Sequence, residues 1–196
     1  MWVKICGVRS LEQALHAWRC GADAVGLNLH APSPRSIDVP SAAVIIREAP
    51  IPCLAVVVDP SSDDLRALNM AIRPAGFQLH GGRPLEGLDC LVAVRAGDPL
   101  PEGRFLLDAR VEGLHGGTGE RVDEDLAREA ATKGQLVLAG GLTPENVAGV
   151  IERVKPWGVD VASGVEREPG LQDPDKVRDF IAAAKGLAPD FLPGAV

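Results

Sequence analysis

The sequence lacks the features that mark membrane and secreted proteins. No apolar run in its 196 residues approaches the roughly 20 residues that a membrane span needs. The amino-terminal segment MWVKICG enters a strand-like run at once and has none of the architecture of a signal peptide. We therefore expect a cytoplasmic protein that does not bind a membrane.

Basic residues are also too few for a nucleic-acid-binding surface. The formal net charge is −7, whereas binding to a phosphate backbone needs a broad cationic surface. We expect no nucleic-acid partner. A small anionic ligand is still allowed, because it needs only a few local donors.

The cysteines show neither a CxxC pair nor the spacing of metal ligands. They stand at positions 6, 20, 53 and 90. Cys20, Cys53 and Cys90 are expected to be small buried apolar residues, as cytosolic cysteines usually are. Cys6 differs because of its position, which is considered below.

What is present is a repeated pattern of strand followed by helix. Eight short segments are apolar and rich in Val, Ile or Leu, as is typical of parallel strands buried on both faces. They are Trp2–Cys6, Ala24–Leu29, Leu54–Asp59, Gly76–His80, Leu91–Arg95, Phe105–Asp108, Leu136–Ala139 and Val159–Ala162. Four helices are expected after the caps Ser10, Ser61, Thr143 and Asp173.

This pattern predicts an α/β fold, a (β/α)₈ TIM barrel, with an open doubly wound sheet as the alternative. We expect one domain over residues 1–186 and a tail over residues 187–196. A barrel usually takes about 250 residues, so this chain is short. The segments 81–90 and 96–104 are too brief for full helices, and we expect short or missing helices after strands four and five.

Polar residues stand repeatedly where predicted strands end. In such barrels the active site lies at the carboxyl ends of the strands. The residues in question are Cys6, His80 and Asp108, followed by Gly140-Gly141 after strand seven and Ser163-Gly164 after strand eight. The whole set is therefore expected around one site.

The two glycine-containing loops predict a phosphate site. Gly140-Gly141 and Ser163-Gly164 would expose backbone N–H groups, which bind anions at helix starts. Barrels commonly hold phosphate between the loops after strands seven and eight. Gly117, in the run Gly116–Gly119, is expected in a third wall.

Several of these segments together resemble the phosphoribosylanthranilate isomerase family. They follow one another in the order in which that family has them and span nearly the whole chain. They are KICG at 4–7, QLHG at 78–81, LLD at 106–108, GGTG at 116–119, AGGLTPENV at 139–147 and DVASGVE at 160–166. The resemblance implies an Amadori rearrangement of N-(5-phosphoribosyl)anthranilate in tryptophan biosynthesis. It implies a small phosphosugar substrate carrying anthranilate, no metal or organic cofactor, and a monomer or a homodimer.

By the same resemblance Asp108 is the general acid and Cys6 the general base. The acid protonates the furanose ring oxygen, and the base removes the proton from C2′. A free thiol has a pKa of about 8.5 and is only a few per cent thiolate at pH 7, so a lowered pKa would help Cys6.

Arg35 matches the arginine that this family places against the anthranilate carboxylate, which a guanidinium binds through two parallel hydrogen bonds. Its alternative is a solvated loop arginine. His80 either lines the pocket or hydrogen-bonds at the barrel rim. The chain departs from the family at Asn28-Leu29-His30, where an aromatic run is usual, and at Ala139 and Ala162, where serines are common.

Two other enzymes and one non-enzymatic function are the alternatives. A related aminoaldose isomerase of histidine biosynthesis typically uses paired aspartates, one of them where Cys6 stands here. A synthase of the neighbouring tryptophan step would need a catalytic lysine, and Lys4 lies too deep. The non-enzymatic alternative is a barrel that binds a phosphate ligand without chemistry.

Strand parity leads to a further hypothesis. Side chains alternate across a strand, so Lys4 points into the barrel if Cys6 faces its mouth. Strand eight neighbours strand one in a closed barrel, and Asp160 lies near its end. A buried unpaired ammonium is costly, so Lys4 and Asp160 are expected to form an interior ion pair, unless strand one is shifted by one residue.

Overall fold

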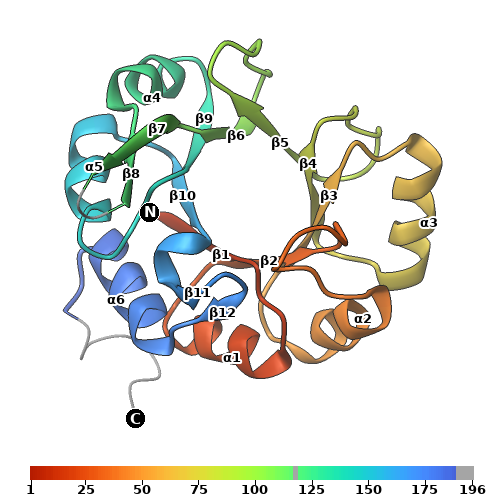
Figure 1. The fold of residues 1–196 in the computed structure, drawn as a ribbon. Coiled ribbons are helices and arrows are strands. Elements are labelled where there is room, and N and C mark those ends of the chain that lie inside the picture. The colour runs from red at the N-terminus through yellow and green to blue at the C-terminus, as the bar shows by residue number, and fades with distance from the viewer. Residues whose placement is uncertain (117–118, 189–196) are drawn as a thin grey trace.

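Eight parallel strands close into a barrel in the computed structural model, which describes residues 1–116 and 119–188. The order around the barrel is β1-β10-β9-β6-β5-β4-β3-β2 (Figure 1). These strands are β1 (Trp2–Cys6), β2 (Ala24–Asn28), β3 (Cys53–Val58), β4 (Gly76–His80), β5 (Cys90–Arg95), β6 (Arg104–Asp108), β9 (Gln135–Ala139) and β10 (Gly158–Val161). The TIM barrel is confirmed, and the open sheet is wrong.

The strands form where expected because each carries apolar residues on both faces. One face packs inside the barrel, where small and medium side chains such as Ala24, Leu54 and Val137 meet. The other face packs under the helices in a larger core that includes Val3, Phe105 and Phe180. Because both faces are buried, the register of each strand is fixed, and with it the side chains that reach the barrel mouth.

Within the described residues, six α-helices cover the barrel: α1 (Leu11–Arg19), α2 (Val39–Glu48), α3 (Ser62–Ile72), α4 (Glu124–Ala131), α5 (Val147–Val154) and α6 (Pro174–Lys185). The expected caps Ser10, Ser61 and Asp173 accept hydrogen bonds from the first turns of α1, α3 and α6. In the part of the chain that the structure describes, no helix is long and apolar enough to cross a membrane.

Helix α5 begins later than predicted. The sequence placed its cap at Thr143, but the helix begins at Val147. Asn146 holds the preceding turn: its Oδ1 accepts the N–H of Thr143 at 2.8 Å, and its Nδ2 donates to the carbonyl of Gly141 at 2.8 Å. Asn146 therefore ties this turn to the Gly140-Gly141 loop, while the carbonyl of Thr143 accepts the N–H of Val147 at 3.0 Å and joins the turn to the helix.

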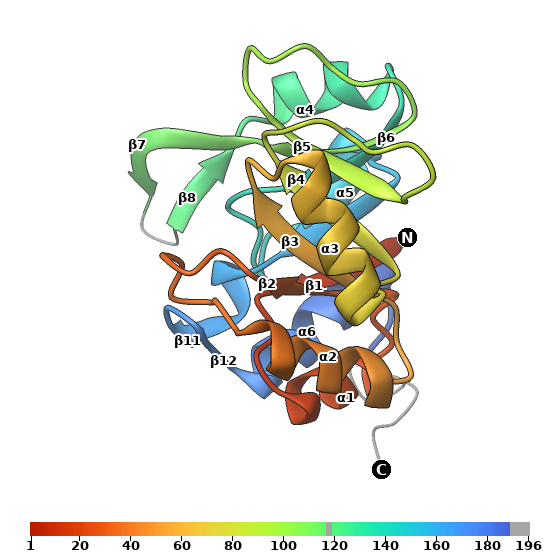
Figure 2. The same ribbon diagram turned by 90° about the vertical axis from the view of Figure 1, so that its right-hand side faces the viewer.

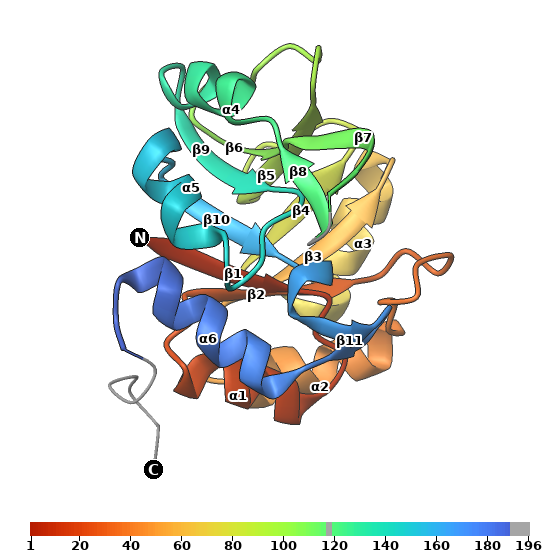
Figure 3. The same ribbon diagram turned by 60° about the vertical axis from the view of Figure 1, so that its left-hand side comes forward.

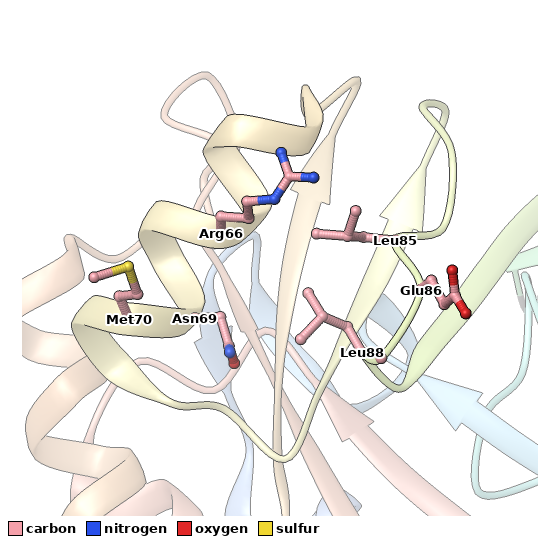
Figure 4. Close-up of a pocket in the computed structure, with 7 residues that line it drawn as sticks. Arg66, Asn69, Met70, Leu85, Glu86 and Leu88 are labelled. Atoms are coloured by element: carbon pink, nitrogen blue, oxygen red, sulfur yellow. The ribbon is translucent and has the colours of Figure 1, made fainter.

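The missing helices after β4 and β5 are confirmed, since the described residues of both connections form none. Leu85 and Leu88 pack against the core where the helix after β4 would lie. They face α3 across a surface groove, with Arg66 and Asn69 on the opposite side (Figure 4). Two leucines thus provide the cover that a helix provides elsewhere.

Two antiparallel hairpins were not expected from the sequence. One joins β7 (Arg110–Gly116) and β8 (Gly119–Val122), and the other joins β11 (Glu166–Glu168) and β12 (Leu171–Gln172). Figures 2 and 3 show both hairpins, with the β2–α2 loop, at the carboxyl end of the barrel, away from the amino terminus. These segments surround the barrel mouth.

Candidate active site

A cavity of about 170 Å³ opens at the carboxyl end of the barrel. Eight of the nine residues expected in the site line it: Cys6, Arg35, His80, Asp108, Gly140, Gly141, Ser163 and Gly164. Gly117 lies outside the described residues. The structure therefore brings together residues that lie far apart in the sequence, from Cys6 to Gly164.

Beneath the mouth lies a buried ion pair. Lys4 and Asp160 are register partners on β1 and β10, and Lys4 Nζ donates to Asp160 Oδ1 at 2.8 Å. Both side chains are buried. The hypothesis of an interior Lys4–Asp160 pair is confirmed, and the shifted register is wrong.

Lys4 and Cys6 share one face of β1 and meet β2 at Gly26. A Cβ atom on Gly26 would lie 2.8 Å from Cys6 Sγ and 2.9 Å from Lys4 Nζ. Glycine at this point leaves the room in which the sulfur and the ammonium approach each other. Any larger residue would push one of them away.

The charges in this layer set the protonation of its members. Burial lowers the pKa of Lys4, but Asp160 and Cys6 raise it by more, so the ammonium stays charged. Burial raises the pKa of the Cys6 thiol, and the charge and hydrogen bonding of Lys4 oppose that rise. The lowered thiol pKa that would help a base is not found, and Lys4 limits the rise.

His80 is a neutral group of the cavity wall. Burial, followed by the charge of Lys4, lowers its pKa below 6.5. Its Nε2 lies 2.9 Å from Nε2 of Gln78, a contact that requires His80 to accept there. Gln78 Oε1 is buried and has no hydrogen-bond partner in the described part of the chain. Of the two placements considered for His80, the pocket wall is correct.

Asp108 ends β6 and stands on a different wall from Cys6, with β10 and β9 between their strands. It is half-buried and lines the cavity. Among the residues that the structure describes, no cluster of three or more His, Cys, Asp or Glu side chains has the arrangement of a metal site. The titratable side chains Cys6 and Asp108 thus reach the cavity from separate walls of the barrel.

The two glycine loops pack directly on each other. Gly140 and Gly141 have φ values of 89° and 67°, which favour glycine. A Cβ on Gly164 would collide with the carbonyl oxygen of Leu142. The short helix η1 (Ser163–Val165) follows β10 after the single residue Ala162. Backbone from both loops therefore lines one side of the cavity, as a phosphate site between them requires.

Arg35 reaches the cavity from the β2–α2 loop. Its Nε donates to Glu166 Oε1 at 2.8 Å and its Nη2 to Glu166 Oε2 at 2.7 Å. Gly7, with φ 75°, leaves space for the arginine stem, because a Cβ there would lie 2.9 Å from Arg35 Cδ. Arg35 is therefore a fixed group and not a solvated loop residue.

Known proteins share both the sequence and the fold. The family model described as N-(5'phosphoribosyl)anthranilate (PRA) isomerase matches residues 3–96 and 100–183. The chain belongs to the PRA isomerase family. The PRA isomerase of Citrifermentans bemidjiense is 43% identical, with 95% of this chain and 98% of that protein aligned.

Solved PRA isomerase structures match the whole barrel. The enzyme of Thermotoga maritima superposes with a TM-score of 0.84 at 34% identity, covering 95% of this chain and 100% of that one. A PRA isomerase in complex with reduced 1-(o-carboxyphenylamino)-1-deoxyribulose 5-phosphate superposes with a TM-score of 0.81 at 32% identity, with the same coverage. That PRA isomerase thus binds a compound that carries both a phosphate and an aromatic carboxylate.

Some residues of this PRA isomerase site were not identified from the sequence. Glu166 and Gln78 stand inside the quoted motifs but were given no role. Asn28, one of the departures from the family, lines the cavity and shapes the loop of Arg35: its Nδ2 donates to Ser33 Oγ at 3.2 Å, and Ser33 Oγ accepts the N–H of Arg35 at 3.2 Å. A buried carboxylate partner for Arg35 could have been sought, but nothing in the sequence separates Glu166 from its exposed neighbours.

Proposed function

We propose that the chain converts N-(5-phosphoribosyl)anthranilate into 1-(2-carboxyphenylamino)-1-deoxyribulose 5-phosphate, a step of tryptophan biosynthesis. One observation carries the proposal: Cys6, Asp108, Arg35 and the two glycine loops line one cavity in a member of the PRA isomerase family. The expected cytoplasmic location belongs to the same proposal. A phosphorylated substrate does not readily leave water for a bilayer, so enzyme and substrate should share a compartment.

Asp108 acts first, as the general acid. Its carboxylic acid gives a proton to the furanose ring oxygen while the bond from that oxygen to C1′ breaks. The lone pair of the anthranilate nitrogen forms the C1′=N bond, giving an open-chain Schiff base. Asp108 suits this role because it lines the cavity at the end of β6, within reach of a sugar placed in the mouth.

Cys6 then acts as the general base. Its thiolate takes the proton from C2′, and the electron pair moves toward nitrogen to give the enolamine. Protonation at C1′ and loss of the proton on O2′ yield the ketone, and both groups return to their starting forms. The Lys4 ammonium beside the sulfur favours the thiolate that this step needs.

The two ends of the substrate are held by different groups. The backbone N–H groups of Gly140-Gly141 and Ser163-Gly164 bind the phosphate, and Arg35 binds the anthranilate carboxylate. Anchoring both ends leaves C1′ and C2′ between Cys6 and Asp108. No step requires a metal or an organic cofactor, since protons move within one substrate.

The test is turnover of enzymatically generated phosphoribosylanthranilate, followed by the loss of its fluorescence. We expect the wild-type chain to consume it, and Cys6→Ala and Asp108→Asn to lose about 10²–10⁴-fold in kcat. The same variants should still bind the reduced product analogue. A wild-type chain that binds the analogue without turnover would instead be a phosphate-ligand-binding barrel, and a Cys6→Ala variant with full turnover would mean another base.

A further inference from the structure

The guanidinium of Arg35 has two edges that can each hold a carboxylate. Nε and Nη2 form one edge, which Glu166 occupies through bonds of 2.8 and 2.7 Å. Nη1 and the second N–H of Nη2 form the other. Among the residues that the structure describes, no group bonds to Nη1 of Arg35, although the side chain lines the cavity. A guanidinium carries five N–H donors in a rigid plane, so this outer edge remains available for a second, parallel pair of hydrogen bonds.

We propose that Glu166 is a positioning residue, which holds Arg35 with its outer edge toward the cavity and thereby sets recognition of the carboxylate on the aromatic part of the substrate. The inference rests on the proposed role of Arg35 as the carboxylate-binding residue. Glu166 touches no substrate in this arrangement and acts through Arg35.

Glu166 is itself held firmly. It is buried, and its Oε1 also accepts the N–H of Gly170 at 3.0 Å. Its backbone carbonyl accepts Lys176 Nζ at 2.9 Å. Both carboxylate oxygens are therefore hydrogen-bonded, and Glu166 could follow a turning Arg35 only by giving up its bond to Gly170. The stem of Arg35 also lies close to Gly7, and rotation of the guanidinium would break both of its bonds to Glu166.

The same segment also carries half of the proposed phosphate site. Glu166 follows η1 (Ser163–Val165) directly and begins β11. Ser163 and Gly164 stand two or three residues before the carboxylate that orients Arg35. The spacing between the phosphate anchor and the carboxylate anchor is thus fixed within one short stretch of chain, which favours a ligand with two anionic ends at one separation.

The alternative is that Glu166 competes with the substrate carboxylate, binding Arg35 only until substrate arrives. A substrate carboxylate would then have to displace Glu166 and leave a buried carboxylate without its partner, which is costly. Use of the outer edge avoids that cost, because Glu166 keeps its bonds. The two arrangements predict opposite effects of removing the charge of Glu166: weaker binding if it positions Arg35, and tighter binding if it competes.

The experiment compares two probes by isothermal titration calorimetry. One is reduced 1-(o-carboxyphenylamino)-1-deoxyribulose 5-phosphate, and the other is the same compound without the ring carboxyl group. For Glu166→Gln we expect at least about tenfold weaker binding of the carboxylate probe, since a hydrogen bond to a charged group commonly contributes that much. Binding of the second probe should not change. The matched control is Glu168→Gln, on the same strand but exposed, which should bind both probes as the wild type does.

Steady-state kinetics and a double variant separate positioning from a merely structural role. Glu166→Gln should raise KM with little change in kcat, and it should add nothing in an Arg35→Met background. Equal loss of both probes, unchanged binding, or tighter binding by Glu166→Gln would each overturn the inference. A different result would show that Arg35 does not bind the substrate carboxylate: the Arg35→Met variant would then bind the two probes as the wild type does.

Discussion

Replacing Lys4 by methionine and Asp160 by leucine, singly and together, measures how strongly the barrel depends on its interior ion pair. The charges are separated by 2.8 Å, and their side chains are 0% and 7% exposed. At an effective dielectric constant of about 20, two unit charges at this distance attract by about 6 kcal/mol. The cost of removing both from water offsets much of that attraction.

The energetic expectation is therefore asymmetric. Each single substitution leaves one buried charge without its partner and should lower the free energy of unfolding by about 3–5 kcal/mol. The double variant leaves no charge and should lose much less than the sum of the two. We expect a coupling free energy of at least about 3 kcal/mol, which is a large part of the 5–15 kcal/mol that holds a typical domain together.

Urea unfolding followed by circular dichroism gives the four free energies of the cycle. The surface pair Asp63–Arg66 is the control, because its atoms are similarly close, at 2.9 Å, but its side chains are 95% and 58% exposed. Its coupling should be below about 1 kcal/mol. If the Lys4–Asp160 cycle were additive, or no larger than this control, the electrostatic reasoning would be wrong.

Three further predictions concern the cavity. Because burial raises the pKa of Cys6, its alkylation by iodoacetamide, followed by mass spectrometry, should have a midpoint above that of a free thiol. The Lys4→Met/Asp160→Leu double variant should move that midpoint higher still, since Lys4 lowers the pKa more than Asp160 raises it; a downward shift would contradict this. The pKa of His80 is lowered, so as the pH falls through 6.5 the imidazole takes up a proton in the unfolded chain before it does so in the folded protein. The free energy of unfolding is therefore higher above that pH and decreases below it. His80→Gln should flatten the fall in denaturation midpoint between pH 7 and 5. Gly164→Ala should raise KM and weaken competitive inhibition by inorganic phosphate, because a methyl group there displaces the neighbouring loop; an unchanged inhibition constant would place the phosphate elsewhere.

Much of the fold could be predicted because the strands are buried on both faces. Their apolar runs are distinct in the sequence, and β1 and β4 occupy the expected residues without change. Barrel closure made β1 and β10 neighbours, and strand parity with the cost of an unpaired buried ammonium then predicted that Lys4 meets Asp160. Local and long-range information agree in this part of the molecule.

The helices were harder to predict because short helices depend on packing. The predicted barrel implied helices after strands two and six, but α2 and α4 were not located in the sequence, although Asp38 and Asp123 cap them. Each is ten residues or fewer, a length at which tertiary contacts decide whether a helix forms. The start of α5 was misplaced for a related reason: the side chain of Asn146 binds backbone on the preceding turn, and a cap pattern cannot show that competition.

The residues of the site were predicted more completely than the contacts between them. Strand ends placed Cys6, His80 and Asp108 together, since the topology determines where strands end. The contact of Arg35 with Glu166 joins residues 131 positions apart, through a hairpin that the sequence pattern did not reveal. Contacts of this kind depend on loop geometry and are the part of a barrel site that periodicity cannot supply.

The side of the barrel where no helix follows β4 and β5 also offers a place to divide the molecule. Residues 96–99 between β5 and β6 are exposed, and Gly97 and Gly103 have nothing within 4 Å of the position of a Cβ atom. The family match itself is interrupted over 97–99. Exposed loops with few contacts tolerate cleavage and insertion best. A break here would leave β1–β5 with Cys6 and Arg35 on one fragment, and β6–α6 with Asp108 and both glycine loops on the other. The proposed base and acid, Cys6 and Asp108, would then meet only when the two fragments reassociate into one barrel.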